Sequence, residues 1–232
     1  MATAWSEIIT AAMQVIDDIR WQEQLTAVPA QFYASKCDTV RFALPLLRRP
    51  PELLEYLQSD VVQPAWLPGE WISTQESLTG ATEIQSGFLG GDLFDAAVRS
   101  ADGLEITPYS GATYDPATGI ITFPQQTEAG VEYQWDIFTD GSFPDLTQTQ
   151  MRLFGLAIAV VWDERFERSF IDLTPKIHDS SFSTVNEANY IEKSNRRLLI
   201  NRQSFEDELR GYEQDCAYAT VVANRAAKTT LV

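Results

Sequence analysis

Apolar side chains recur every three or four positions in three stretches of residues 1–60, the spacing that places them on one side of an α-helix. The first stretch predicts one helix of about twenty residues at the start of the chain. Its inward side would hold Trp5, Ile8, Ile9, Ala12, Val15, Ile16 and Ile19. A second helix is predicted from Pro29 to about Leu44, with Pro45 ending it, and a short third helix from Glu52 to Gln58. Residues 1–60 are therefore expected to form an N-terminal helical part.

After Val61 the pattern changes to short apolar pieces separated by glycine and proline, which is typical of strands and turns. The clearest hairpin runs from Ala112 to Phe123 around the turn Asp115-Pro116-Ala117-Thr118-Gly119. A further strand is predicted over residues 131–138, where apolar and polar side chains alternate. Residues 61–146 are thus predicted to be a β-rich insertion.

Helical periodicity returns at residue 147. Thr147 and Gln150 have the form of a capping box directly before an apolar run. They predict a helix over about residues 148–168 that is apolar nearly all round and therefore central and buried. A last helix begins at Ser183 or Thr184 and continues past Tyr218, longer than its own core requires.

These patterns give a division of the chain and a fold class. Residues 147–220 are expected to form a C-terminal helical part, and residues 221–232 an extended C-terminal tail. The predicted fold is α+β: a helical bundle body of N-terminal helices, a buried central helix and a long C-terminal helix, with the β-rich subdomain inserted into it.

The charge is concentrated in one part of the chain. Residues 61–150 hold thirteen Asp and Glu against a single basic residue, Arg99, and so carry -12 of the formal -16. The flanking parts are nearly balanced, and the tail has Arg225 and Lys228 but no acid. Because affinity for nucleic acid comes from clustered Lys and Arg, this distribution argues against DNA or RNA as a tightly bound ligand.

Export and membrane insertion are not expected. Glu7, Asp17 and Asp18 interrupt the apolar core that a secretory signal needs. The longest apolar run, Leu153 to Trp162, is about half the length of a bilayer span.

The residues that could carry catalysis do not form a recognisable motif. Cys37 and Cys216 lack CxxC spacing and are predicted to be reduced, buried thiols. His178 and Asp179 are neighbours in an extended segment, where adjacent side chains point to opposite faces. The glycines of Gly87 to Gly91 lack the Lys-Ser/Thr ending of a phosphate-binding loop and predict a turn. We therefore expect no enzyme activity, no cofactor and no metal.

The acids of the 131–138 strand leave two further hypotheses open. Glu132 and Asp136 share a face of the strand and could act as the carboxyl pair of an acidic hydrolase. Together with Asp140 they could bind a cation, although residues 136–141 lack the ligands of a calcium loop. The interpretation we prefer is a solvated acidic face of the sheet.

Aromatic residues of the same region suggest a third alternative. Tyr114, Tyr133 and Trp135 could stack on a sugar ring in a carbohydrate- or receptor-binding module. Alternating aromatics on a strand more often belong to a core, which is the interpretation we prefer here.

The order of several short aromatic and turn segments resembles that of the head-to-tail connector, or adaptor, proteins of tailed bacteriophages. The resemblance covers most of the chain and includes no catalytic motif. The segments that carry it are Ile16-Asp17-Asp18-Ile19-Arg20-Trp21, Phe32-Tyr33, Pro50-Pro51, Gly119-Ile120-Ile121-Thr122-Phe123, Trp135-Asp136-Ile137-Phe138-Thr139-Asp140-Gly141-Ser142-Phe143 and Trp162-Asp163-Glu164-Arg165-Phe166.

The resemblance implies a structural virion protein of the neck, between capsid and tail, made in the host cytoplasm. Such a protein assembles as a ring, commonly of about twelve copies, on the portal protein. Its partners would be the portal, neighbouring copies and further neck or tail proteins, and DNA would pass through without specific binding. The residues implied in portal or partner binding are Tyr212, Tyr218, Arg225, Lys228, Leu231 and Val232.

The resemblance leaves the exact position in the assembly open, because a head-completion or tail-end protein would differ only in its neighbours. It also gives the acidic block a role in the DNA conduit, since an acidic wall repels phosphate and prevents sticking. The block could equally lie on the outside of the ring.

Overall fold

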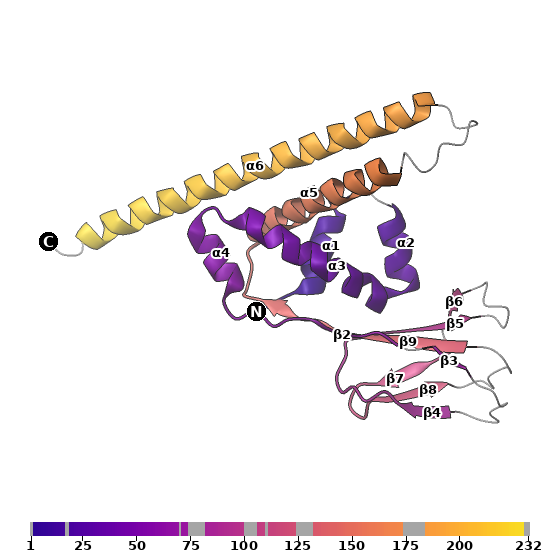
Figure 1. Cartoon of the computed structure of the whole chain (residues 1–232). Coiled ribbons are helices and arrows are strands. Elements are labelled where there is room, and N and C mark those ends of the chain that lie inside the picture. Colours follow the sequence, from indigo (N-terminus) through magenta and orange to yellow (C-terminus); the bar gives the residue numbers. More distant parts are fainter. Residues whose placement is uncertain are drawn as a thin grey trace.

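The structure is a computed structural model with a mixed α+β fold (Figure 1). It describes residues 2–16, 19–69, 71–73, 82–99, 106–109, 111–123, 132–173 and 184–229.

Most of the helices gather on one side of the described chain (Figure 1). Their bounds are α1 Trp5–Met13, α2 Ile19–Ala27, α3 Pro29–Ala43, the 3-10 turn η1 Leu44–Leu47, α4 Pro51–Gln58, α5 Gln148–Leu173 and α6 Thr184–Thr229. The helices predicted from Pro29 to about Leu44 and from Glu52 to Gln58 are α3 and α4, whose ends differ from the predicted ones by at most one residue. Pro45 lies inside η1, so the helical path continues to Leu47 instead of ending at this proline.

The single opening helix was a wrong prediction, because α1 ends at Met13 and α2 begins at Ile19. Ile19, which we expected to face inward, is 72% exposed. The break allows Trp21 to pack edge-on against Phe32 of α3 and Trp162 of α5. Burial of this large ring favours the break.

The predicted capping box and central helix are confirmed. The Gln150 N–H donates to Thr147 Oγ1 (3.3 Å), and the Thr147 N–H donates to Gln150 Oε1 (2.9 Å). Every residue from Leu153 to Val161 is buried. At Gly155 the helix passes so close to α1 that an added Cβ would lie 3.2 Å from the Ala11 backbone. The helix continues to Leu173, five residues past the predicted end.

The β-rich part contains antiparallel strands arranged in two packed sheets (Figure 1). Within the described residues, one sheet has the order β2–β9–β5–β6, with β3 also paired to β9, and the other has the order β4–β8–β7. Their bounds are β2 Ala65–Leu67, β3 Ile72–Ser73, β4 Thr82–Gln85, β5 Leu93–Arg99, β6 Ile106–Pro108, β7 Thr113–Asp115, β8 Ile120–Phe123 and β9 Glu132–Thr139. A small third sheet pairs β1 Thr3–Ala4 with β10 Ser142–Phe143.

Both predicted β features are confirmed. The Ala112 to Phe123 segment forms the β7–β8 hairpin, in which Thr113 pairs with Thr122 and Gly119 has a φ of 70°. β9 matches the predicted strand, and the core between the two sheets is apolar. The buried residues of this core are Ile121, Phe123, Tyr133, Trp135 and Ile137.

Candidate partner-binding site

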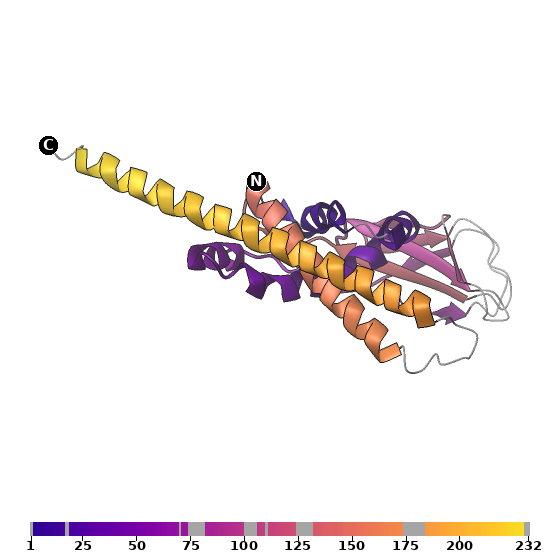
Figure 2. The ribbon, with the colours of Figure 1, turned by 90° about the horizontal axis from the view of Figure 1, so that it is seen from above.

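The most unusual element of the described chain is α6, which is longer than the body it lies on. With 46 residues it extends about 69 Å at 1.5 Å per residue. Its N-terminal half lies beside α5, whereas its C-terminal end projects past the other helices in both views (Figures 1 and 2). The sequence predicted a helix too long for its core, and the structure agrees with that description.

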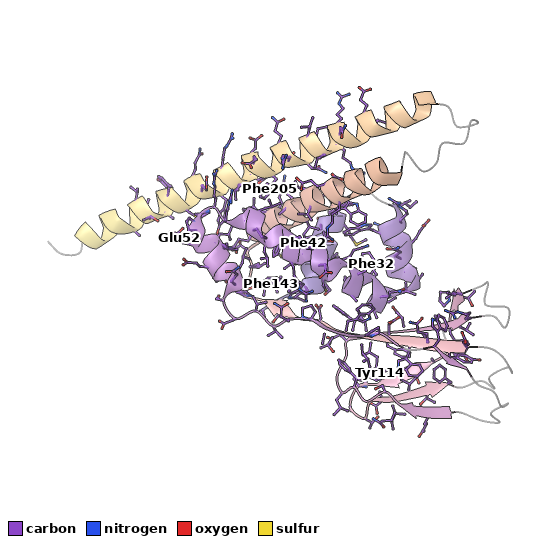
Figure 3. The ribbon with its side chains drawn as sticks, in the orientation of Figure 1. Phe32, Phe42, Glu52, Tyr114, Phe143 and Phe205 are labelled. Atoms are coloured by element: carbon purple, nitrogen blue, oxygen red, sulfur yellow. The ribbon has the colours of Figure 1, made fainter. Side chains whose placement is uncertain are left out.

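The middle of α6 is held on α5 by apolar and ionic contacts. Phe205 (Figure 3) and Leu209 are buried, at 3% and 4% exposure. The Asp163 carboxylate of α5 accepts hydrogen bonds from the Arg197 guanidinium and from Asn201 Nδ2. Because Asp163 is itself buried, this pair orients α6 more firmly than a surface ion pair would.

Tyr212 joins α6 to the start of α5. Gln150, whose Oε1 already caps α5, donates from Nε2 to the Tyr212 hydroxyl (3.0 Å). Partial burial raises the pKa of this phenol. Beyond Tyr212, α6 runs past α4 and then projects from the helical body.

A groove of about 670 Å³ lies where α6 departs, between α6 and α4. Leu53 of α4 and Cys216 and Ala217 of α6 form apolar parts of its wall. Glu52 (Figure 3) and Glu213 add carboxylates from the two helices. The groove is therefore partly apolar and carries acidic side chains on both helices.

The sequence-predicted partner-binding residues are distributed along this end of α6. Tyr212 lines the groove and is half-buried, whereas Tyr218 is 72% exposed on the projecting part. Arg225 and Lys228 lie on the helix, but their side chains are not described. Leu231 and Val232 lie outside the described residues.

The predicted extended tail was a wrong prediction over residues 221–229, because α6 continues to Thr229. We read the small residues after Val221 as a sign of an extended segment. Alanine is instead the strongest helix former, and no glycine or proline follows Gly211. The sequence missed two exposed residues of this end, Val221 and Val222, at 49% and 46% exposure.

The preferred interpretation of a solvated acidic face is contradicted for Asp136. This residue is only 8% exposed, and its Oδ1 accepts from the Gly69 N–H (3.3 Å). Burial raises its pKa. Glu132 forms an ion pair with Arg99 (2.9 Å), whose guanidinium also lies over Trp71. Each of these acids therefore has a local structural partner.

Two acids of the β-rich part instead cap helices. Asp140 accepts from the Ser6 N–H at the start of α1 (3.3 Å), and Asp95 accepts from the Gln31 N–H at the start of α3 (2.9 Å). The residue before α3, Val28, has no side-chain cap of its own. Since a helix N-terminus has free N–H groups and a partial positive charge, these carboxylates join the helices to the sheet.

This arrangement predicts a pH dependence that a matched variant can isolate. Burial raises the pKa of Asp95 to about 6, and the charge of Asp136 acts in the same direction, although the N–H groups of Gln31 and Ala30 oppose the shift. The folded protein then binds this proton more tightly than the unfolded chain. Stability from Asp95 is therefore greatest below about pH 4 and falls as the pH rises through about 6.

We expect Asp95→Asn to keep the acceptor for Gln31 and to lack this pH-dependent loss, which is about 2 kcal/mol for the wild type. Asp95→Ala, which also loses the cap, should be less stable than Asp95→Asn by about 1 kcal/mol at pH 7. Urea unfolding between pH 4.5 and 7.5 measures both effects. Parallel curves for the wild type and Asp95→Asn would show that the Asp95 carboxyl does not titrate in this range.

The aromatic residues considered for sugar binding belong to the core, as we preferred. Tyr133 and Trp135 are 8% and 7% exposed between the two sheets. Tyr114 stacks on Phe94 and donates its hydroxyl to the Gly90 carbonyl oxygen (2.6 Å; Figure 3). The three rings do not form an exposed platform, so no observation favours a carbohydrate-binding module.

The structure describes some of the other residues considered for catalysis or ligand binding, but not all of them. Cys37 is buried, which raises its pKa to about 12, and Cys216 is a half-buried thiol in the groove. The glycines from Gly87 to Gly91 have positive φ and form the predicted turn. His178 and Asp179 lie outside the described residues.

The residues that the structure describes include no group of three or more His, Cys, Asp or Glu side chains placed to hold a metal ion. Within the same residues, no helix combines the length and the apolar character needed to cross a bilayer.

Comparison with known proteins adds no relative to this picture. Neither the protein-family models, nor the curated proteins, nor the solved structures contain a match to this chain.

Proposed function

We propose that this chain is a structural virion protein, a head-to-tail connector that docks onto a portal as an oligomeric ring and forms part of the DNA conduit. In this proposal a helical bundle body carries residues 61–146 as an inserted β-rich subdomain. The segment from Tyr212 onward binds the partners. The observation that carries the proposal is the projecting end of α6 with its exposed apolar side chains.

A helix in this position favours an assembly role for a physical reason. Single helices are marginally stable in water, and most helical stability in proteins comes from packing of an apolar face. Tyr218, Val221 and Val222 are exposed on the projecting part. Exposed apolar groups that cluster on one element often mark protein interaction sites. A partner that covers this end would bury these side chains and stabilise the helix.

The charge of the β-rich part is compatible with a DNA conduit. Arg99, the one basic residue between 61 and 150, is paired with Glu132. Exposed acids such as Glu83, Asp92 and Asp115 contribute a field that repels phosphate. We propose that this part faces the lumen. A ring structure in which residues 61–150 lie far from the channel would refute this placement.

The experiment that tests the proposal is co-sedimentation with candidate portal rings of tailed phages, using the full chain and a variant that ends at Ala219. We expect the full chain to sediment with the rings and the truncated chain to remain in the supernatant. Far-UV circular dichroism should show that the body of the truncated protein is intact. A truncated protein that binds the rings equally well would contradict the assignment of the C-terminal end.

A matched control separates the projecting end from exposed apolar surface in general. Leu199 and Ile200 also lie on α6 and are 66% and 55% exposed, but they precede the part that leaves the body. Leu199→Ser/Ile200→Ser should therefore bind the rings like the full chain. Binding to tail-tube ends instead of portals would identify the alternative, a head-completion or tail-end protein of the same assembly.

A further inference from the structure

We propose that the groove between α4 and α6 receives the projecting end of α6 from a second copy of this chain. The inference rests on the proposed ring and names the contact between neighbouring copies. In this contact one surface of one copy binds a different surface of the next copy. One is the groove, and the other is a stripe on α6 formed by Tyr218, Val221 and Val222, on the same helix as Arg225 and Lys228.

The groove has the chemistry of a site for a basic, apolar helix. Leu53 and Ala217 offer apolar contact, and the α6 wall of the groove has the small residues Ala219 and Thr220, which allow close approach of a second helix. Among the described residues, neither Glu52 nor Glu213 forms an ion pair. An incoming cation would therefore not have to displace an existing partner.

The stripe has the complementary chemistry. Tyr218, Val221 and Val222 follow one another at helical spacing and are exposed. Arg225 and Lys228 continue the spacing of three along the same helix. After Asp215 the chain contains no further acid. The end of α6 is thus apolar and basic, whereas the groove is apolar and acidic.

The occupant has to come from another molecule. α6 is one continuous helix to Thr229, and its end leads away from the groove (Figure 1). The stripe could reach the groove of its own chain only if the helix broke and reversed. A contact between two different surfaces of identical chains is heterologous, and such contacts close into rings when the rotation between copies permits.

The contact leaves part of α6 available for the portal. A helix that lies in a groove buries one side, and its opposite side stays exposed. Neighbour binding and portal binding by the same end of α6 are therefore compatible.

The native thiol in the groove provides a direct test by cross-linking. One protein is the wild type, with Cys216 in the groove. The second is labelled with 15N and carries Cys216→Ser and Val222→Cys. A short bismaleimide is added to the mixture, with and without portal rings. Cys37 should not react, because burial raises its pKa to about 12 and keeps it protonated.

We expect a mixed product, with one labelled and one unlabelled chain, at roughly tenfold the yield of the control, because docking raises the local concentration of the two thiols. The control carries Leu199→Cys in place of Val222→Cys, an exposed position on the same helix that lies outside both the stripe and the groove lining. Adding Arg225→Glu and Lys228→Glu to the Val222→Cys protein should return the yield to the control level.

Two results would overturn the inference. One is a mixed product no more abundant than the Leu199→Cys control, both with and without portal rings. The other is efficient cross-linking of wild-type chains through two Cys216 thiols, which indicates a symmetric pair instead of a head-to-tail contact. Portal rings that still retain the full chain would then leave the proposed function standing. Mixed products without portal binding would support the copy-to-copy contact and contradict the connector.

Discussion

Replacing Gly69 with alanine is expected to destabilise the protein by about 3 kcal/mol, one of the largest single effects that the structure predicts. A Cβ at this position would overlap the Trp135 carbonyl oxygen and lie 2.6 Å from the Trp135 amide nitrogen. The obstacle is backbone in the middle of β9, which cannot move aside as a flexible side chain can.

The same substitution would also disturb two hydrogen bonds. The Gly69 N–H donates to Asp136, and the Gly69 carbonyl oxygen accepts from Gln134 Nε2 (2.8 Å). Any shift that relieves the clash moves Gly69 away from β9 and leaves the buried Asp136 carboxyl with fewer donors. Loss of a partner for a buried polar group costs about 1–3 kcal/mol.

Urea unfolding followed by tryptophan fluorescence measures the effect, and Gly211→Ala is the matched control. Gly211 lies in α6, where no atom is within 4 Å of an added Cβ. Alanine is the better helix former, so the control should gain about 1 kcal/mol. Equal unfolding midpoints for the two variants would contradict the close approach at Gly69.

Asp163→Ala is the second substitution with a large expected effect, a loss of about 3 kcal/mol. Asp163 is 2% exposed and is the acceptor for both Arg197 and Asn201 of α6. Its removal would leave a half-buried guanidinium and an amide without their acceptor. The cost should be concentrated around residues 197–201 of α6, because both hydrogen bonds that Asp163 accepts come from there.

Hydrogen exchange measures that localisation, and the neighbouring Glu164 supplies the control. Glu164 also pairs with an arginine of α6, Arg202 (2.9 Å), but both side chains are partly exposed. Glu164→Ala should therefore cost less than about 1 kcal/mol. We expect faster amide exchange around residues 195–205 in Asp163→Ala only. Similar exchange in the two variants would mean that burial of Asp163 adds nothing to the attachment of α6.

Local patterns were enough to predict several elements. The capping box at Thr147, the buried run from Leu153, the hairpin around Gly119 and the strand of Tyr133 and Trp135 all appear where the sequence indicated. Each depends on residues that are close in sequence. Spacing and turn chemistry are therefore sufficient to recognise them.

The candidate site was predicted only in outline. The sequence indicated a long last helix and placed partner binding at its end, but it did not indicate the groove or the helical state of residues 221–229. The groove needs α4 and α6, which are separated by more than a hundred residues of chain. No periodicity in either segment shows that they lie beside each other.

The sequence by itself determined the period of each element, the fold class, and the concentration of acidic residues in the middle of the chain. Only the tertiary structure decided that the opening helix breaks before Ile19, that Asp95 and Asp140 cap helices, and that Gly69 lies against Trp135. The physical reason is that periodicity arises within one element. Burial, helix capping and close backbone contacts depend on which groups of a distant segment pack against that element.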